Sequence, residues 1–374
     1  MKITFKKTPE QIELVKAMAS RNRDTAYEAQ AAIAEFIGPV LAEVIAQAPT
    51  LSNFFETITF EADENPSIPL DLYYDITDED YIKIYTNNVA GGLPSNTVVP
   101  TQSEMKFTTY RLDTAVDFDN KYVARSRMDV VAKAFARIAQ ELLVKQDKSA
   151  ASMVLGTLAD AETNGLKHVI SSNSHNRLIL DDLNKLMTRA KRINTSWIGG
   201  TPAESRRGIT DIVVSPEIVE SLRSMAYNPI NTVAADGAAP VNTEDGIPAT
   251  DELRNQIYNG AGLPSFYGVN IIEMFEFGVG QKYNELYAAL GGTSLAGGGG
   301  DASFVAADDE IILGLDRTRD SMYRAVALDA DNGSELTLLP DDQYSIRQQK
   351  VGFYGAIEEG RMVLDSRAVF GIAV

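Results

Sequence analysis

The apolar residues of the first 55 positions follow a helical spacing. Thr8, Pro9 and Gln11 predict a helix start, with Thr8 as the cap, Pro9 in the first turn and Gln11 reaching back to the cap. Two amphipathic helical stretches follow, and Gly38-Pro39 is expected to interrupt the second one. A segment this thin cannot bury its apolar face alone, so we expect it to pack on the body of the protein or on a neighbour.

Aromatic and β-branched residues dominate residues 56–119, which is typical of strands. The runs Tyr81–Tyr85 and Met105–Phe118 flank the turn-rich stretch Asn87–Asn96. This pattern predicts a long β-hairpin. Because a lone two-stranded hairpin is marginally stable in water, we expect it to lie on another protein surface.

Residues 121–160 show the strongest helical pattern, and the apolar stripe recurs at spacings of four, three and four. A helix of 30 or more residues would be a rod of about 45 Å or more. Gly156 and Asn164-Gly165 are its predicted end signals. The stripe is formed by Val131, Phe135, Ile138 and Leu142, with Met153 further along.

The second half of the chain reads as an α/β unit followed by strands. A helix is expected from Asp181 to Ile193, capped by Asp181 or Asp182, and Asp211–Ser215 reads as a buried strand that leads into a helix over Glu217–Met225. Alternate residues from Val269 to Phe277 are expected on one face of a strand. Loops are expected at 227–265 and 291–300. The predicted C-terminal strands are Ile311–Leu315, Tyr323–Leu328, Glu335–Leu339, Gln343–Phe353 and Met362–Val374.

Composition places the chain among ordinary globular proteins. It has 374 residues, of which 44% are hydrophobic and 23% charged, and no apolar run long enough to cross a bilayer. The N-terminus lacks the apolar middle of a secretory signal, so we expect a cytoplasmic protein. The formal charge of −18 repels phosphate backbones. Ordinary solubility explains that charge, and so does a container wall that must not adhere to packed DNA.

Several kinds of active site lack their usual residues. The sequence has no cysteine and only two histidines, which argues against thiolate sites, histidine triads and multi-histidine metal sites. His168 and His175 are interpreted as exposed loop histidines, since no Gly-x-Ser-x-Gly elbow accompanies them. The glycines at 291–300 lack the Lys-Ser/Thr of a phosphate loop. Asp329–Glu335 has some calcium-loop character, but a tight turn fits its spacing better. We therefore expect no catalytic residue, cofactor or metal.

A basic cluster stands out against the acidic background. Such a cluster could contact nucleic acid or a neighbouring acidic surface, and in so acidic a chain we favour salt bridges between subunits. Its members are Lys185, Arg189, Lys191, Arg192, Arg206 and Arg207.

The order of elements is amphipathic arm, long hairpin, long helix, α/β unit and β-rich C-terminus. This order, with the stretches Arg206–Val219 and Tyr354–Val369, resembles the major capsid proteins of tailed bacteriophages, which have the Hong Kong 97-type fold. The resemblance implies an α+β fold with an N-terminal arm, an extended E-loop hairpin, a spine helix in a peripheral domain and an α/β axial domain. The implied segments are 1–55 (arm), 56–119 (E-loop hairpin and peripheral strands), 120–200 (spine helix and peripheral domain), 201–320 (axial domain) and 321–374 (C-terminal strands shared by the two domains).

The resemblance also implies a structural role and not an enzymatic one. The chain would assemble with itself into hexamers and pentamers of an icosahedral head shell that encloses phage DNA without binding it specifically. It would be assembled in the host cytoplasm and end in the virion. Scaffolding, portal and decoration proteins are further partners of such shells, and no membrane is involved. The implied assembly contacts are Lys83, Asn87, Asn88, Lys106, Arg125, Arg189, Arg192, Arg206 and Arg207.

Two properties of some family members bear on this chain. Some weld subunits through a Lys–Asn isopeptide bond, for which Lys83 or Lys106 could serve, but Ala356–Val374 contains no asparagine. We therefore expect a noncovalent shell. Many members lose an N-terminal scaffold segment, and here we expect no such cut, with scaffolding by a separate protein or by none.

Three alternatives stay open. The same fold could build an encapsulin-like compartment that holds a cargo enzyme. The chain could be a soluble acidic hydrolase or cation-binding enzyme, which would behave as a small oligomer. It could also be a tail or adhesion component, which would form tubes or fibres.

Overall fold

The structure of the protein is a computed structural model. It describes residues 8–20, 22–46, 48, 50–61, 66–69, 104–125, 128–163, 165–172, 178–193, 208–227, 268–292, 303–328, 333–341 and 349–374. The chain divides into two compact units. Unit 1 comprises 1–68, 105–150 and 323–362, and unit 2 comprises 69–104, 151–322 and 363–374. Each unit draws on several separate stretches of the sequence.

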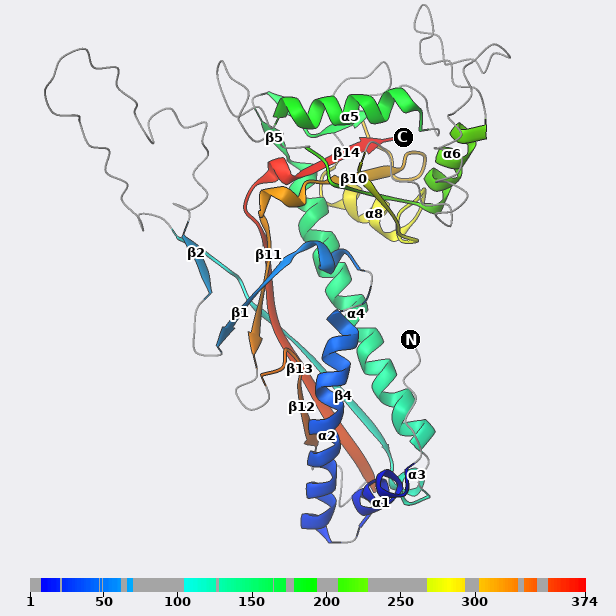
Figure 1. Cartoon of the computed structure of the whole chain (residues 1–374), viewed down its shortest axis with the longest axis vertical. Helices are drawn as coiled ribbons and strands as arrows, with labels where there is room; N and C mark the ends of the chain where they lie inside the picture. Colours follow the sequence, from blue (N-terminus) through cyan, green and yellow to red (C-terminus); the bar gives the residue numbers. More distant parts are fainter. Residues whose placement is uncertain are drawn as a thin grey trace, which may run out of the picture. The chain divides into compact units, whose positions relative to one another are not determined.

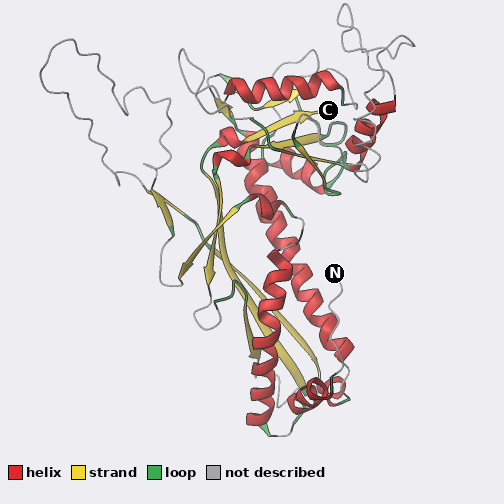
Figure 2. Cartoon of the chain, viewed as in Figure 1, coloured by secondary structure: helices red, strands yellow, loops and turns green. Residues whose placement is uncertain are grey.

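Unit 1 combines helices with a five-stranded sheet (Figure 2). In the sheet, β1, β11, β13 and β12 follow one another, and β4 also pairs with β13. β1 runs parallel to β11, whereas β13 is antiparallel to both β12 and β4. The elements are α1 (Pro9–Met18), α2 (Arg23–Ala46), β1 (Glu56–Glu61), β4 (Tyr110–Asp119), α3 (Asn120–Ala124), the first part of α4 (Met128–Ala159), β11 (Met322–Leu328), β12 (Thr337–Asp341) and β13 (Lys350–Val363).

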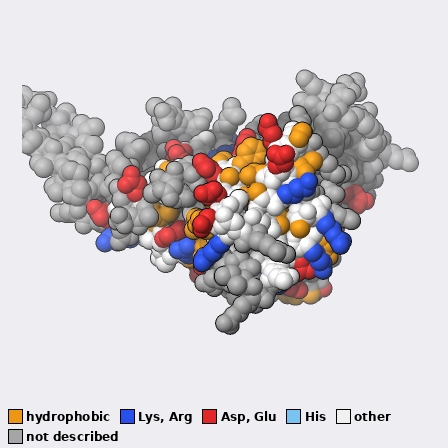
Figure 3. Space-filling view, turned by 90° about the horizontal axis from the view of Figure 1, so that it is seen from below, with side chains coloured by type: hydrophobic (Ala, Val, Ile, Leu, Met, Phe, Trp, Pro, Cys, Tyr) orange, Lys and Arg blue, Asp and Glu red, His pale blue; other side chains and the backbone are white. Residues whose placement is uncertain are grey.

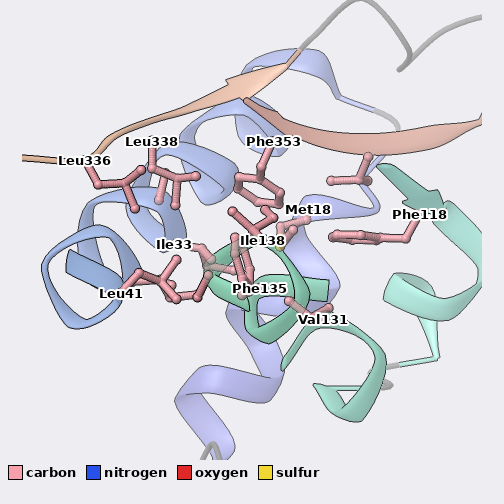
Figure 4. Packing of buried hydrophobic residues seen from close by; sticks show 14 of the residues in the cluster. Met18, Ile33, Leu41, Phe118, Val131, Phe135, Ile138, Leu336, Leu338 and Phe353 are labelled. Atoms are coloured by element: carbon pink, nitrogen blue, oxygen red, sulfur yellow. The ribbon is translucent and has the colours of Figure 1, made fainter. Parts of the chain in front are cut away.

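The predicted stripe of α4 forms the centre of the unit 1 core. Val131, Phe135, Ile138 and Leu142 are all buried and pack with apolar residues of α1, α2, β4, β12 and β13 (Figure 4). The ring of Phe135 meets that of Phe353 edge-on, with 5.0 Å between ring centroids. The N-terminal helices therefore pack on the body of the same chain, one of the two arrangements that the sequence left open.

Two details of the N-terminal helices differ from expectation. Thr8 caps α1 as predicted, with its hydroxyl accepting from the N–H of Gln11, but Oε1 of Gln11 has no hydrogen-bond partner. The reciprocal half of the capping box is therefore missing. Helix α2 is not interrupted at Gly38-Pro39, because it runs through Pro39 to Ala46. Pro39 removes one backbone hydrogen bond, and burial of Ile37 and Leu41 on either side offsets that loss.

Unit 2 is built around a second five-stranded sheet, in the order β7-β14-β10-β8-β9. β10 is antiparallel to β14 and β8, whereas β9 runs parallel to β8 and β7 parallel to β14. Helices α5 and α6 share one apolar core with this sheet. The elements are β5 (Glu162–Thr163), β6 (Leu166–Lys167), β7 (Val169–Ser171), α5 (Leu180–Ile193), β8 (Asp211–Val214), α6 (Pro216–Tyr227), β9 (Asn270–Glu273), α8 (Lys282–Ala289), β10 (Ile311–Leu315) and β14 (Val369–Ala373), and Figure 1 labels most of them.

The predicted start of α5 is off by one residue. The helix begins at Leu180, so Asp181 and Asp182 lie in its first turn and neither is the N-cap residue. The Asp182 carboxylate accepts from the N–H of Ile179, the residue before α5, and from the hydroxyl of Ser172. Ser215 directly follows the strand β8 and caps α6, since its hydroxyl accepts from the N–H of Ile218. The α+β class is therefore confirmed by both units, each of which has its own helices and its own sheet.

Several details of the predicted elements are wrong. The single strand β13 (Lys350–Val363) extends from one predicted C-terminal strand into the next, and β14 begins only at Val369. Gly156 does not end the long helix, because α4 continues to Ala159. Met153 leaves the buried stripe and is 36% exposed. The strand expected from Val269 to Phe277 stops at Glu273, and Phe275 is exposed while Phe277 is buried. At Met153 and in the Val269–Phe277 run, the local spacing continued past the point where packing changes, whereas at Gly156 the helix continued past a residue that often ends one.

Two glycines offer a matched test of packing. Gly156 lies inside α4, and a Cβ there would meet only the Leu290 side chain at 3.9 Å. We expect Gly156→Ala to raise the free energy of unfolding by about 0.5–1 kcal/mol, since alanine loses less entropy in a helix. A Cβ on Gly360 would lie 2.9 Å from the Thr108 carbonyl oxygen. Gly360→Ala should therefore lower that free energy by about 1–3 kcal/mol.

Urea denaturation of the two variants beside the unmodified chain measures both effects. Two changes of the same sign would contradict the assignment of Gly156 to open space and of Gly360 to a close backbone contact.

Candidate assembly surfaces

The residues predicted for assembly fall into two groups. Lys83, Asn87, Asn88, Arg206 and Arg207 lie outside the described residues. Among the others, Lys106 is exposed at the end of β3 (Glu104–Lys106), and Arg125 is exposed directly after α3. Arg189 is half-buried and Arg192 exposed, and both lie on α5.

The base of the predicted hairpin is present. β2 (Ser67–Pro69) and β3 pair in a two-stranded sheet, and the N–H of Phe107 donates to the carbonyl of Pro66. The remainder of the predicted hairpin, including Tyr81–Tyr85 and Asn87–Asn96, lies outside the described residues. The predicted hairpin strand Met105–Phe118 is wrong over most of its length, because β4 (Tyr110–Asp119) pairs with β13 in the unit 1 sheet. Only the short pairing of β2 with β3 supports a hairpin, and its outer part stays a prediction.

A small apolar hollow opens between α1, α2 and α4 in unit 1. Its volume is about 50 Å³. Phe36 at its rim is 62% exposed, and Val40 one helical turn further along α2 is 45% exposed. The lining residues are Gln11, Leu14, Val15, Ile33, Phe36, Ile37 and Val131. Exposed apolar area of this kind is typical of contact surfaces.

Surface charges of both signs are mixed with apolar side chains. On the face shown in Figure 3, Asp and Glu, Lys and Arg, and hydrophobic side chains are interspersed. Several exposed pairs join neighbouring elements or turns, such as Lys121 with Asp119 at 2.9 Å and Lys185 with Asp181 at 2.9 Å. Exposed pairs of this kind contribute little to stability.

A buried ionic network crosses the sheet of unit 1. The carboxylate of Glu359 is fully buried and accepts from the guanidinium groups of Arg361 (2.5 Å) and Arg324 (2.9 Å). The amide of Gln146 and the hydroxyl of Tyr110 also donate to it, at 3.1 Å and 2.9 Å. Burial alone would raise the pKa of Glu359, but the two guanidinium groups hold it below its ordinary value. Glu359 is therefore an ionised, satisfied structural group.

A polar recess lies beside this network, with a volume of about 220 Å³. Arg324 lines it, and its guanidinium also pairs with Glu335 at 3.2 Å. The other lining residues are Ile45, Ser52, Asn53, Phe55, Thr57, Gln146 and Glu335. The sequence did not point to this network. Its only signal is the opposite charges of Glu359 and Arg361, two residues apart in a strand, a spacing that places both on one face.

His168 is not the exposed loop histidine that the sequence predicted. Its side chain is fully buried, and the ring stacks on Phe370 with 5.5 Å between centroids. Nδ1 lies 3.0 Å from the carbonyl oxygen of Val369, and Nε2 lies 2.9 Å from the hydroxyl of Thr163. Burial lowers the pKa of His168 below its ordinary value. The ring is therefore a neutral part of the unit 2 core, while His175 lies outside the described residues.

Glu310 is the one described carboxyl whose pKa is raised, to about 7. Burial is the main cause, and the neighbouring carboxylate of Glu217 adds to it, while hydrogen bonds from Ser215 act in the opposite direction. Glu310 lies at the start of β10, where Ser215 leads from β8 into α6. Its charge therefore changes near neutral pH inside the α/β unit.

The described residues offer neither a metal site nor a membrane-spanning helix. In those parts of the chain, no three His, Cys, Asp or Glu side chains are placed to hold a metal ion together. None of the helices that the structure describes is long and apolar enough to span a membrane.

Comparison with known proteins finds similarity in structure and none in sequence families. The sequence matches no protein-family model and no curated protein. The structure is similar to the capsid of the cyanophage P-SCSP1u, with 13% identity, a TM-score of 0.48, and coverage of 85% of this chain and 86% of that one. It is also similar to the capsid of an empty GTA particle, with 13% identity, a TM-score of 0.48, and coverage of 88% and 89%.

A third similar structure is the holo-SrpI encapsulin complex from Synechococcus elongatus PCC 7942, with 11% identity and a TM-score of 0.43. The match covers 86% of this chain and 85% of that one. Two of the three structures are thus described as capsids and one as an encapsulin complex. At these identities and TM-scores below 0.5, the function of the chain has to be argued from its own residues.

Proposed function

We propose that the chain is the subunit of a self-assembling protein shell with the Hong Kong 97-type fold, and that the shell is the head of a tailed phage. The observation that carries this proposal is the order of elements along the chain. N-terminal helices, the root of a hairpin at β2 and β3, the 32-residue helix α4, and a five-stranded α/β sheet follow one another in the order that the sequence resemblance implies. The C-terminal strands then return to both units.

The surfaces also favour a protein that works among copies of itself. Phe36 and Val40 in unit 1, and Phe275 in unit 2, are large apolar side chains left open to solvent. Such groups favour contact with other protein surface. The formal charge of −18 suits a wall around DNA, because a strongly negative protein repels the phosphate backbone. The proposal therefore includes hexamers and pentamers, packaged DNA without specific binding, assembly in the host cytoplasm and a final place in the virion.

Other members of the proposed assembly follow from the same reading. Scaffolding, portal and decoration proteins would contact the shell, and no catalytic role is assigned to the chain. The alternative within the same fold is an encapsulin-like compartment. The satisfied state of Glu359 and the buried, neutral state of His168 give no support to the alternative of an acidic hydrolase.

Size-exclusion chromatography of the recombinant chain, followed by negative-stain electron microscopy, tests the proposal. We expect elution in the void volume and closed particles of uniform diameter. A small oligomer at every protein concentration would contradict the shell, and tubes or fibres would favour a tail component. The contents of particles from infected cells separate the two shells, since DNA indicates a phage head and a single enzyme indicates a compartment.

Deletion of Asn87–Asn96 is a second test of the same function. We expect the shortened chain to fold, with an unchanged far-ultraviolet circular dichroism spectrum, and to form no particles. A deletion of similar length at 293–300, in the other glycine-rich stretch, serves as the comparison. Intact particles from the Asn87–Asn96 deletion would contradict a role of the hairpin in assembly.

A further inference from the structure

The two edges of the unit 2 sheet differ in chemistry. The strand order places β7 at one edge and β9 at the other. With four strand spacings between them, the edges are about 19 Å apart. The side chains near each edge can therefore contact different molecules at the same time.

The β9 edge ends in two loops that expose apolar side chains. Phe275, two residues after the end of β9, is 74% exposed, and Val279 and Val305 are 47% and 46% exposed. The N–H of Gly280 donates to the carbonyl of Ala306, so the two loops are joined beside Val279 and Val305. A single exposed valine needs no explanation. Three such side chains on two joined loops are typical of a contact surface.

The turn that presents Phe275 is built into the core. Phe277, two residues on, is fully buried and meets Tyr283 edge-on at 5.3 Å. Gly278 adopts a φ of +131°, which side-chain-bearing residues rarely adopt. The loop is therefore anchored from within, and the exposure of Phe275 is a fixed feature of the fold.

The same region is strongly acidic. Residues 268–292 and 303–310 contain six acidic side chains, of which Glu310 is buried, and one lysine, Lys282. Glu276 lies in the Phe275 loop and is half-buried, and Asp308 lies in the Val305 loop and is exposed. We call the surface formed by Phe275, Val279, Val305, Glu276 and Asp308 the acidic patch.

The β7 edge carries the opposite charge. Lys185, Arg189 and Arg192 are spaced by four and three residues, so they lie on one side of α5. The guanidinium of Arg189 donates to the carbonyl of Lys167, two residues before β7 begins. This contact holds the side of α5 that bears the three basic residues next to the β7 edge. We call these three residues the basic stripe.

We propose that the acidic patch of one copy of the chain docks against the basic stripe of a second copy. The inference rests on the proposed function and names the surfaces that join neighbouring subunits. An apolar centre bordered by charge is the usual anatomy of a protein interface, and opposite charges select the partner and its orientation. Because the two surfaces lie on different edges of unit 2, the contact is head-to-tail. Repetition of a head-to-tail contact closes into a ring when the rotation permits.

A charge swap tests the pairing. One variant carries Glu276→Lys and Asp308→Lys, a second carries Lys185→Glu and Arg192→Glu, and a third combines all four changes. We expect each of the first two to lower the assembled fraction at least tenfold in sizing experiments. The combined variant should regain most of the wild-type fraction, because opposite charges face each other again.

Two further variants separate assembly from folding. Phe275→Ser should abolish assembly while leaving the melting temperature of the unassembled chain unchanged, since Phe275 is mostly in solvent. Glu141→Lys reverses an exposed charge on α4 in unit 1, an element that carries neither surface, and should leave assembly unchanged.

Each outcome of these experiments bears either on the docking proposal alone or on both proposals. Unchanged assembly in both two-residue charge variants, or no recovery in the combined one, would overturn the docking proposal and leave the shell function standing. A wild-type chain that never assembles would overturn both proposals.

Discussion

Replacement of Glu359 by glutamine is expected to lower the free energy of unfolding by about 3–5 kcal/mol, the usual cost of removing one partner from a buried ion pair. Glu359 is fully buried, and it is the shared partner of Arg361 and Arg324. Glutamine keeps the shape but leaves two guanidinium groups in the interior without their shared counter-charge. Urea denaturation of the unassembled chain, followed by circular dichroism, measures the change.

The neighbouring residue supplies the control. Glu358 is half-buried, and its pairing across the sheet is with Arg111 of β4. Glu358→Gln should change the free energy of unfolding by no more than about 0.5 kcal/mol. Equal losses in the two variants would show that the network around Glu359 does not contribute more than an ordinary strand position.

The difference in stability between the wild-type chain and Glu359→Gln depends on pH, because the pKa of Glu359 is lowered in the folded protein. A carboxyl whose folded pKa lies below its unfolded value adds stability above the unfolded value, and this stability is lost as pH falls through the folded value. The wild-type chain should therefore lose its advantage over Glu359→Gln as pH falls below about 4.5. At neutral pH the difference in the free energy of unfolding between the two proteins should have its full value.

The sequence predicted elements whose signal is local. The stripe of Val131, Phe135, Ile138 and Leu142 predicted α4 because helical spacing and burial coincide there. The change from strand β8 to helix α6 at Ser215-Pro216 was equally predictable, since the helix cap and the proline act within a few residues. These features need no knowledge of distant parts of the chain.

The errors occur where distant segments decide the outcome. His168 is buried because β14, about 200 residues later, pairs with β7, and the N–H of Gly371 donates to the carbonyl of His168 itself. The local sequence, a histidine between Lys167 and Val169, carries no trace of that pairing. Pro39 stays inside α2 for a similar reason, since Leu41 is buried in the core that α4 and β13 complete.

Of the two candidate surfaces, one was predictable from local sequence and the other was not. The basic stripe was visible as a cluster, because Lys185, Arg189 and Arg192 follow helical spacing. The acidic patch was not, because Phe275 continued an alternating pattern that predicted a longer strand. Its exposure depends on the end of β9 at Glu273 and on the contact between Gly280 and Ala306, which joins segments 26 residues apart.

Replacement of Phe135 by alanine should lower the free energy of unfolding by about 3–5 kcal/mol, the range for removing a buried phenylalanine from a core. Phe135 is fully buried in α4 and meets Phe353 of β13 edge-on, and Phe353 in turn stacks near Phe118 at 6.0 Å (Figure 4). The loss combines apolar transfer energy with a cavity that rigid helices and strands cannot fill. Urea denaturation of the unassembled chain measures it.

Phe36 provides the matched control, since it is the same residue type in another helix of unit 1 but is 62% exposed. Phe36→Ala removes the same atoms from a site that is mostly in solvent, so the loss should stay below about 1 kcal/mol. If Phe36 contributes to contact between copies, its replacement should weaken assembly while stability holds. A comparable loss of stability at both positions would contradict the assignment of Phe135 to the core and of Phe36 to the surface.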